Sequence, residues 1–93
     1  MAELGTRRTF EIVNELGMHA RAATKLVHLA GRYTSEIELE KDGHRANAKS
    51  VMGVLLLCGG KGSKVTVHAQ GDDAEEAVAA LGQLIADRFG EPR

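Results

Sequence analysis

The chain has 93 residues, of which 43% are hydrophobic, and this is enough for one domain with a modest core. Its 12 basic residues nearly balance its 13 acidic ones, and it has only two phenylalanines and one tyrosine, so we expect neither a nucleic-acid nor a membrane partner. The single cysteine excludes an internal disulfide, and no run reaches the length of a signal peptide or a membrane span. These features predict a cytoplasmic protein.

The first predicted elements are a strand and a helix. Residues 8–13 (RTFEIV) alternate between apolar and polar side chains, as a half-buried strand does. Residues 20–30 carry one apolar stripe at helical spacing, and Gly31 stands where a C-terminal cap belongs. The apolar stripe consists of Ala23, Leu26, Val27 and Ala30.

Alternation, turn residues and caps predict the remaining elements. Asp42-Gly43 is a strong signal for a tight hairpin between two alternating segments. Ser50 is suited to cap a short apolar helix, and Asp72 or Asp73 to cap a final one. The predicted strands are 35–40, 44–48 and 63–69, with Val65 and Val67 facing inward. The predicted helices are 50–57 and a segment that carries Ala74, Val78, Leu81 and Ile85 and is closed by Gly90 and Pro92.

The predicted order is therefore β-α-β-β-α-β-α in a single domain, residues 1–93, with its core over roughly 7–90. Every predicted strand alternates, so each shows one face to a core and one to water. This pattern predicts an α+β fold: an open-faced sandwich in which helices cover one face of a four-stranded antiparallel sheet. Periodicity does not give the order of the strands in the sheet.

His19 stands where the first predicted helix begins. Gly17 before it allows a tight turn, and the free N–H groups and dipole of a helix start favour an anion and disfavour the charged ring. Arg21 can place its guanidinium against an anion on that ring. A neutral imidazole beside an anion cradle is what reversible phosphorylation of histidine requires, whereas a lone loop histidine is usually a solvated surface residue.

The other reactive side chains predict no second site. His28, His44 and His68 are expected to be solvated, so His19 has no partners for a metal site and no cofactor is expected. The glycine-rich run 59–63 leads from helix to strand, the reverse of a phosphate-binding loop, and predicts a plain connection. The cysteine, Cys58, is expected to be a small buried or half-buried filler rather than a reactive thiol.

Three motifs together resemble the HPr family, the histidine-containing phosphocarriers of the phosphoenolpyruvate-dependent phosphotransferase system. They are GMHAR (17–21), NAKSVMGVLLL (47–57) and GGKGSKV (59–65). The resemblance implies a phosphocarrier that is not a catalytic enzyme. It also implies a sheet with the strands in the order first, fourth, second, third.

The resemblance implies a role for four residues. His19 would take the phosphoryl group on Nδ1, and Arg21 would steady it. The backbone N–H groups of Ala20 and Arg21 would cap the phosphate. Ser50 would be the regulatory serine that HPr kinase phosphorylates in bacteria that have this enzyme.

Two positions depart from the family's pattern. Many members have proline where this chain has Ala22, and a small polar residue where it has Leu16. Alanine loosens the first helical turn slightly without removing a phosphate ligand. These departures affect fine tuning and partner choice rather than the role of His19.

The short helix 50–57 is apolar nearly all round, so part of it is expected to be exposed. The resemblance implies that it docks enzyme I and the permease A components. We expect Val51, Met52 and Leu55 to form this surface on a monomer.

Other functions fit part of the pattern. A small acyl-phosphate hydrolase would use Asn47 to position water, but it gives no reason for His19 at a helix start. A purely regulatory HPr-like module would act through Ser50, and the chain could equally serve sugar uptake or the nitrogen-related branch of the phosphotransferase system.

Overall fold

The computed structural model describes residues 5–93, which form four strands, three α-helices and a terminal 3₁₀ turn in the predicted order. The strands are β1 (Gly5–Glu11), β2 (Glu36–Lys41), β3 (His44–Asn47) and β4 (Lys64–Gln70). The helices are α1 (Ala20–Ala30), α2 (Val51–Leu57) and α3 (Ala74–Ala86), followed by the turn η1 (Arg88–Gly90).

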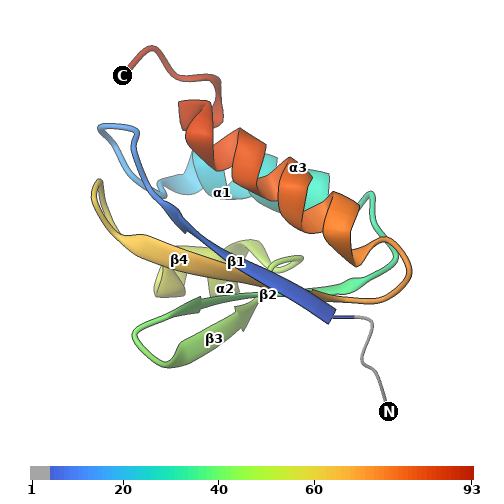
Figure 1. Ribbon diagram of the computed structural model, residues 1–93. Helices are drawn as coiled ribbons and strands as arrows, with labels where there is room; N and C mark the ends of the chain where they lie inside the picture. Colours follow the sequence, from blue (N-terminus) through green and yellow to red (C-terminus); the bar gives the residue numbers. More distant parts are fainter. Residues whose placement is uncertain (1–4) are drawn as a thin grey trace.

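The four strands make one antiparallel sheet in the order β1-β4-β2-β3. This is the strand order that the resemblance implied. Helices α1 and α3 lie across one face, while α2 packs against α1 and β3 (Figure 1). The α+β open-faced sandwich is therefore confirmed.

Alternation along the strands builds the core. On β4, Val65 and Val67 are fully buried beneath the helices, as predicted. On β2, Ile37 and Leu39 are buried in the same way. The ring of Phe10 on β1 packs so closely on α3 that a Cβ added to Gly82 would lie 2.2 Å from it. The hairpin turns at Asp42 and Gly43, whose positive φ angles of 53° and 82° fit the predicted tight turn.

The ends of several elements differ from the prediction. β1 begins at Gly5 instead of residue 8, and α3 ends at Ala86, before Gly90. The helix stops early because Arg88 and Phe89 both take positive φ, which turns the chain and leaves Phe89 fully buried.

Asp73 is the residue before α3, yet its side chain makes no capping bond to that helix. Its carboxylate instead accepts hydrogen bonds from the N–H groups of Thr34 and Ser35, both at 2.9 Å. The Ser35 hydroxyl also donates to this carboxylate. The hydroxyl bond is the largest cause, followed by the backbone bonds, of a pKa of Asp73 that is lowered to about 2. Asp73 therefore joins the turn before β2 to the turn before α3.

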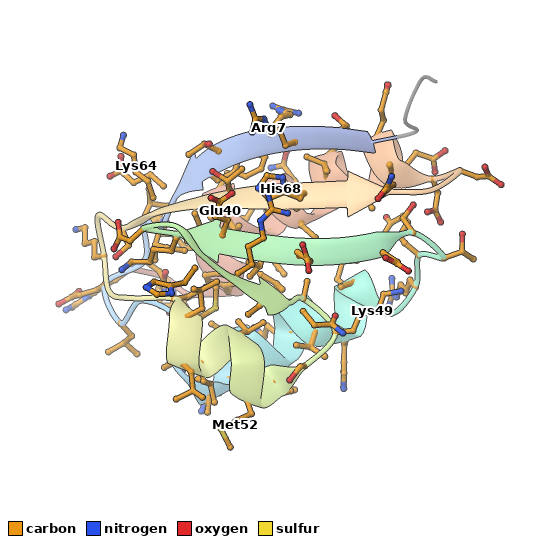
Figure 2. All side chains as sticks on the ribbon, turned by 90° about the horizontal axis from the view of Figure 1, so that it is seen from below. Arg7, Glu40, Lys49, Met52, Lys64 and His68 are labelled. Atoms are coloured by element: carbon orange, nitrogen blue, oxygen red, sulfur yellow. The ribbon has the colours of Figure 1, made fainter. Side chains whose placement is uncertain are left out.

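The prediction that His68 is simply solvated is wrong. Its side chain lies on the open face of the sheet but is only 16% exposed, and its Nε2 is 2.5 Å from the Glu40 carboxylate (Figure 2). Strand β2 runs beside β4, which brings the two side chains together. His28 and His44 are exposed, as predicted. Within residues 5–93, the helices are too short or too polar to cross a membrane.

Candidate functional site

The loop between β1 and α1 is held in place by the connection that follows α2. Gly17 has a φ of 69°, and a Cβ at this position would lie 2.6 Å from the Cα of Gly60. The N–H of Met18 donates to the carbonyl of Gly59 at 3.1 Å. Glycine is therefore required here both by its backbone conformation and by the close approach of the second loop.

This loop places His19 at the N-cap of α1, as predicted. Its carbonyl accepts the first helical hydrogen bond, from the N–H of Ala23 at 2.9 Å. Its Nδ1 accepts the N–H of Arg21 at 3.3 Å, so the ring itself caps the helix. The side chain is 27% exposed, which leaves part of the ring open to solvent.

The other ring nitrogen of His19 contacts a residue that the sequence analysis did not identify. Nε2 hydrogen-bonds the carboxylate of Glu91, which lies 72 positions along the chain in the C-terminal segment. Asn14 donates to the second oxygen of this carboxylate at 2.9 Å. The pKa of Glu91 is lowered, first by the Asn14 hydrogen bond and then by that of His19, while burial opposes the change.

These contacts select one form of the neutral imidazole. An ionised carboxylate only accepts hydrogen bonds, so Nε2 carries the proton and donates it to Glu91. Nδ1 then has the free lone pair and accepts from the backbone of Arg21. The nitrogen with nucleophilic character is therefore the one that faces the positive end of α1.

Arg21 and the helix start supply groups that bind anions. The guanidinium of Arg21 is exposed and makes no hydrogen bond or ion pair within residues 5–93. Ala20 is the first residue of α1, where N–H groups lack an acceptor within the helix. A phosphoryl group on Nδ1 would meet both kinds of donor.

Ser50 caps α2, as predicted: its Oγ accepts the N–H of Gly53 at 3.1 Å. Lys49 beside it donates through Nζ to the carbonyl of Tyr33 at 2.8 Å (Figure 2). Ser50 is partly exposed at the start of this helix.

The exposed side of α2 differs in part from the expected one. Met52 is exposed as predicted, at 66%, and points away from the body of the protein (Figure 2). Val51 and Leu55 are only half-exposed, because they pack against the core on either side of the buried Val54. Leu56, at 81%, is more exposed than any of them.

The remaining candidates stay outside the site. Cys58 is half-buried, as predicted, and burial raises the pKa of its thiol to about 11, which disfavours the reactive thiolate. Leu16 is 71% exposed in the loop before His19. No group of three potential metal ligands occurs among the residues that the structure describes.

Comparisons with known proteins show the family to which the chain belongs. Residues 6–87 match a family described as the "PTS HPr component phosphorylation site". The chain is 48% identical over 85 residues to the phosphocarrier protein HPr of Cupriavidus necator. The aligned residues cover 91% of this chain and 96% of that protein. It is 40% identical to the HPr of Neisseria meningitidis over the same shares of the two chains.

Solved structures give the same result. The crystal structure of HPr-C-His from Thermoanaerobacter tengcongensis matches with a TM-score of 0.90 at 44% identity, covering 95% of this chain and 99% of that one. An HPr from Bacillus anthracis matches with a TM-score of 0.81 at 39% identity, over 85% and 94% of the two chains. The chain therefore belongs to the HPr family, the phosphocarriers of the phosphotransferase system.

Proposed function

We propose that the chain carries a phosphoryl group on Nδ1 of His19. It accepts the group from phosphorylated enzyme I in the cytoplasm and passes it to permease A components. This proposal rests on the different contacts of the two ring nitrogens: Nε2 is hydrogen-bonded to Glu91, while Nδ1 faces the start of α1.

The transfer is a displacement at phosphorus. The Nδ1 lone pair attacks the phosphorus of a phosphohistidine on enzyme I and forms a new N–P bond. The old N–P bond breaks, and its electron pair stays on the donor nitrogen. The Nε2 proton remains between the ring and Glu91, whose negative charge offsets the positive charge that the ring gains. The same displacement in reverse, with an acceptor nucleophile, delivers the group to an A component.

The surroundings of Nδ1 suit the phosphorylated form. Once Nδ1 bonds to phosphorus it no longer accepts the Arg21 N–H, which is then free to donate to a phosphoryl oxygen. The Ala20 N–H and the Arg21 guanidinium add further donors at the positive end of a helix. Such bonds stabilise the phosphoryl group enough to hold it yet leave it exposed for transfer.

A hydrolase is less well supported. It would need a group that activates water, and Glu91 is already held by Asn14 and His19. Asn47, the expected water-positioning residue, ends β3 with its Oδ1 accepting the N–H of Lys49 at 2.8 Å. Steady turnover of acetyl phosphate without a covalent label on His19 would favour the hydrolase over the carrier.

We also propose that phosphorylation of Ser50 by an HPr kinase/phosphorylase regulates transfer, because Ser50 directly precedes the exposed α2 surface. The purely regulatory module remains the second candidate for that reason. A purely regulatory module would not accept phosphate on His19, whereas a carrier would. Comparison of transfer to A components of the sugar and nitrogen-related branches would assign the branch.

We propose that the chain acts as a monomer. Some solved relatives are described as dimers: Crh of Bacillus subtilis, a swapped dimer, matches with a TM-score of 0.72 at 42% identity, and an HPr dimer of Thermoanaerobacter tengcongensis matches with 0.75 at 45%. A carrier presents the same face to successive partners, and a single chain leaves that face open. Light scattering at micromolar concentration tests this, and a stable mass of two chains would contradict it.

The proposed function is tested by replacing the histidine. The variant His19→Ala is incubated with enzyme I and labelled phosphoenolpyruvate, beside His28→Ala as a control on the exposed side of α1. We expect no acid-labile label on His19→Ala and normal labelling of His28→Ala, with both variants folded. Wild-type labelling of a folded His19→Ala protein would overturn the proposal.

A further inference from the structure

Asn14 is fully buried in the loop that precedes His19, although it is a polar residue. Its Nδ2 group donates twice: to the carbonyl of Gly17 at 2.8 Å and to the carboxylate of Glu91 at 2.9 Å. Both partners only accept hydrogen bonds, so the orientation of the amide is fixed by the network. Its Oδ1 is buried and has no hydrogen-bond partner within residues 5–93.

We propose that Asn14 is a positioning residue for phosphoryl transfer: it holds Glu91 against Nε2 of His19 and thereby keeps the lone pair on Nδ1. Asn14 does not contact the imidazole and acts through Glu91. The inference rests on the proposed function and adds to it the residue that determines which ring nitrogen reacts.

The position of Glu91 requires such an anchor. Glu91 follows Arg88 and Phe89, two consecutive residues with positive φ, a conformation that non-glycine residues seldom adopt. Burial of Phe89 and the 2.7 Å bond from Lys25 Nζ to its carbonyl fix the backbone of this segment. They do not orient the carboxylate, whereas the Asn14 amide bonds it directly.

Asn14 also acts at the other end of the same loop. Its bond to the Gly17 carbonyl supports the tight turn that sets His19 at the N-cap. One amide group therefore fixes both the backbone beneath the histidine and the carboxylate beside its ring. A neutral amide suits this role because it donates two hydrogen bonds without adding a charge that would compete for Glu91.

The unpartnered Oδ1 of Asn14 distinguishes a positioning role from a purely structural one. A buried acceptor without a partner destabilises the folded state, so an apolar side chain would serve a purely structural position better. The two donated bonds are the property that an apolar residue lacks. They converge on the turn before His19 and on the carboxylate that bonds its ring.

The first test measures the tautomer of the unphosphorylated ring. Two-bond ¹H–¹⁵N spectra at a pH where the ring is neutral give the share of molecules with the proton on Nε2. We compare Asn14→Ala and Glu91→Ala with Glu15→Ala, a matched control in the same loop whose carboxylate pairs, within residues 5–93, only with Arg93. We expect both test variants to move toward the mixture of a solvated histidine, while Glu15→Ala keeps the wild-type share.

The second test measures single-turnover transfer from phosphorylated enzyme I. Asn14→Ala is expected to lower the maximal rate about threefold to tenfold, the effect of about one hydrogen bond, with the half-saturating concentration unchanged. The double variant Asn14→Ala/Glu91→Ala should be slower than Glu91→Ala by less than the factor that Asn14→Ala costs alone, because the carboxylate that Asn14 orients is already absent.

Several results would overturn the inference. One is a folded Asn14→Ala protein with the wild-type tautomer share and transfer rate, and another is a double variant in which the two losses multiply. If Asn14→Ala does not fold, Glu91→Ala remains decisive, because an unchanged tautomer there removes the route through Glu91. Failure of the wild-type protein to take phosphate on His19 would instead remove the proposed function, so the two failures are read from different measurements.

Discussion

At the scale of single residues, the site depends on how His19 uses its two nitrogens. Nδ1 accepts the N–H of Arg21 at the start of α1, and Nε2 is hydrogen-bonded to Glu91 in the C-terminal segment. The Glu91 contact selects the tautomer, because an ionised carboxylate only accepts a hydrogen bond, and the Arg21 N–H then meets the lone pair on Nδ1. Together they place the lone pair where a phosphoryl group would meet backbone donors.

The exposed guanidinium of Arg21 leads to the first prediction. Arg21→Ala should still accept phosphate but transfer it about tenfold to a hundredfold more slowly, because one charge-assisted contact to the phosphoryl group is lost. Stopped-flow transfer rates check this, and Arg21→Lys should recover part of the loss. The melting temperature should stay at the wild-type value, since the side chain is exposed. A wild-type rate for Arg21→Ala would exclude this role.

Ser50 supports a second prediction. Ser50→Ala should transfer normally and lose about 0.5–2 kcal/mol of stability, because the Oγ that accepts the Gly53 N–H is removed. Ser50→Asp keeps a capping oxygen but places a charge beside Val51 and Met52, so it should slow transfer from enzyme I with little change in melting temperature. Equal rates for Ser50→Asp and wild type at low protein concentration would leave Ser50 as a cap only.

At the scale of elements, α3 approaches the sheet closely at Gly82, beside the Phe10 ring of β1. Replacing a helical glycine by alanine normally stabilises by about 0.5–1 kcal/mol. Here the new methyl group would lie 2.2 Å from the Phe10 ring, and overpacking of this kind costs about 1–3 kcal/mol. We therefore predict that Gly82→Ala lowers the free energy of unfolding measured in urea.

A matched glycine provides the control. Gly31, after α1, has an ordinary φ of −65°, and an added Cβ would approach no atom closer than 3.4 Å. Gly31→Ala should therefore be neutral or slightly stabilising. A Gly82→Ala protein as stable as Gly31→Ala would show that Phe10 moves aside at little cost.

The bond between Asp73 and the turn before β2 gives a prediction with a definite pH range. The pKa of Asp73 falls from 3.8 to about 2, so its contribution is complete well above pH 3.8 and is lost as the pH falls toward 2. Asp73→Asn should melt below wild type at neutral pH, and the gap should narrow between about pH 4 and pH 2. Asp72→Asn, an exposed neighbour, should show no such pH dependence. A gap that stays constant down to pH 2 would contradict this account.

Periodicity and capping residues in the sequence predicted which helices and strands are present better than where each one begins and ends. The helix α1 was predicted with its observed bounds because His19 and Gly31 mark its two ends and the apolar stripe lies between them. The end of α3 was misplaced because Phe89 turns inward through a positive φ, which depends on the core it fills and not on its neighbours in sequence.

The candidate site was predicted only where its parts are close in sequence. His19, Arg21 and the helix start lie within three positions, so one motif contains them. Glu91 is 72 positions away, and its contact depends on the path of the chain after α3. Asn14 precedes the motif but gives no signal, because its role depends on Glu91. The pairing of His68 with Glu40 was missed for a related reason, since strand order follows from packing and not from periodicity.

At the scale of the whole molecule, the proposed function requires that an apolar surface and the His19 site are both open to successive partners. Met52 and Leu56 leave large apolar side chains in solvent on α2, and exposed apolar side chains of this kind mark partner surfaces. Helix α2 packs against α1, whose N-cap is His19. In the proposed function, a partner that covers α2 would also reach the start of α1.

This arrangement leads to the last of the predictions from substitutions. Met52→Glu should weaken association with enzyme I, because a charge replaces an apolar contact. Its melting temperature should remain near wild type, because the side chain is 66% exposed. Titration calorimetry and thermal unfolding are measured on the same samples, with Met52→Leu as the conservative control. A large drop in melting temperature, or unchanged affinity, would remove Met52 from the docking surface.

The central claim is that Nδ1 of His19 carries the phosphoryl group, and NMR of the phosphorylated protein tests it most directly. The ¹⁵N-labelled wild-type chain is incubated with phosphoenolpyruvate and a catalytic amount of enzyme I, and ³¹P and ¹⁵N spectra are recorded before the phosphate is lost. The account predicts one acid-labile phosphorus signal, coupled to Nδ1 of His19, with the proton retained on Nε2. A phosphorus signal coupled to Nε2, or one on another residue while His19 stays unmodified, would contradict it.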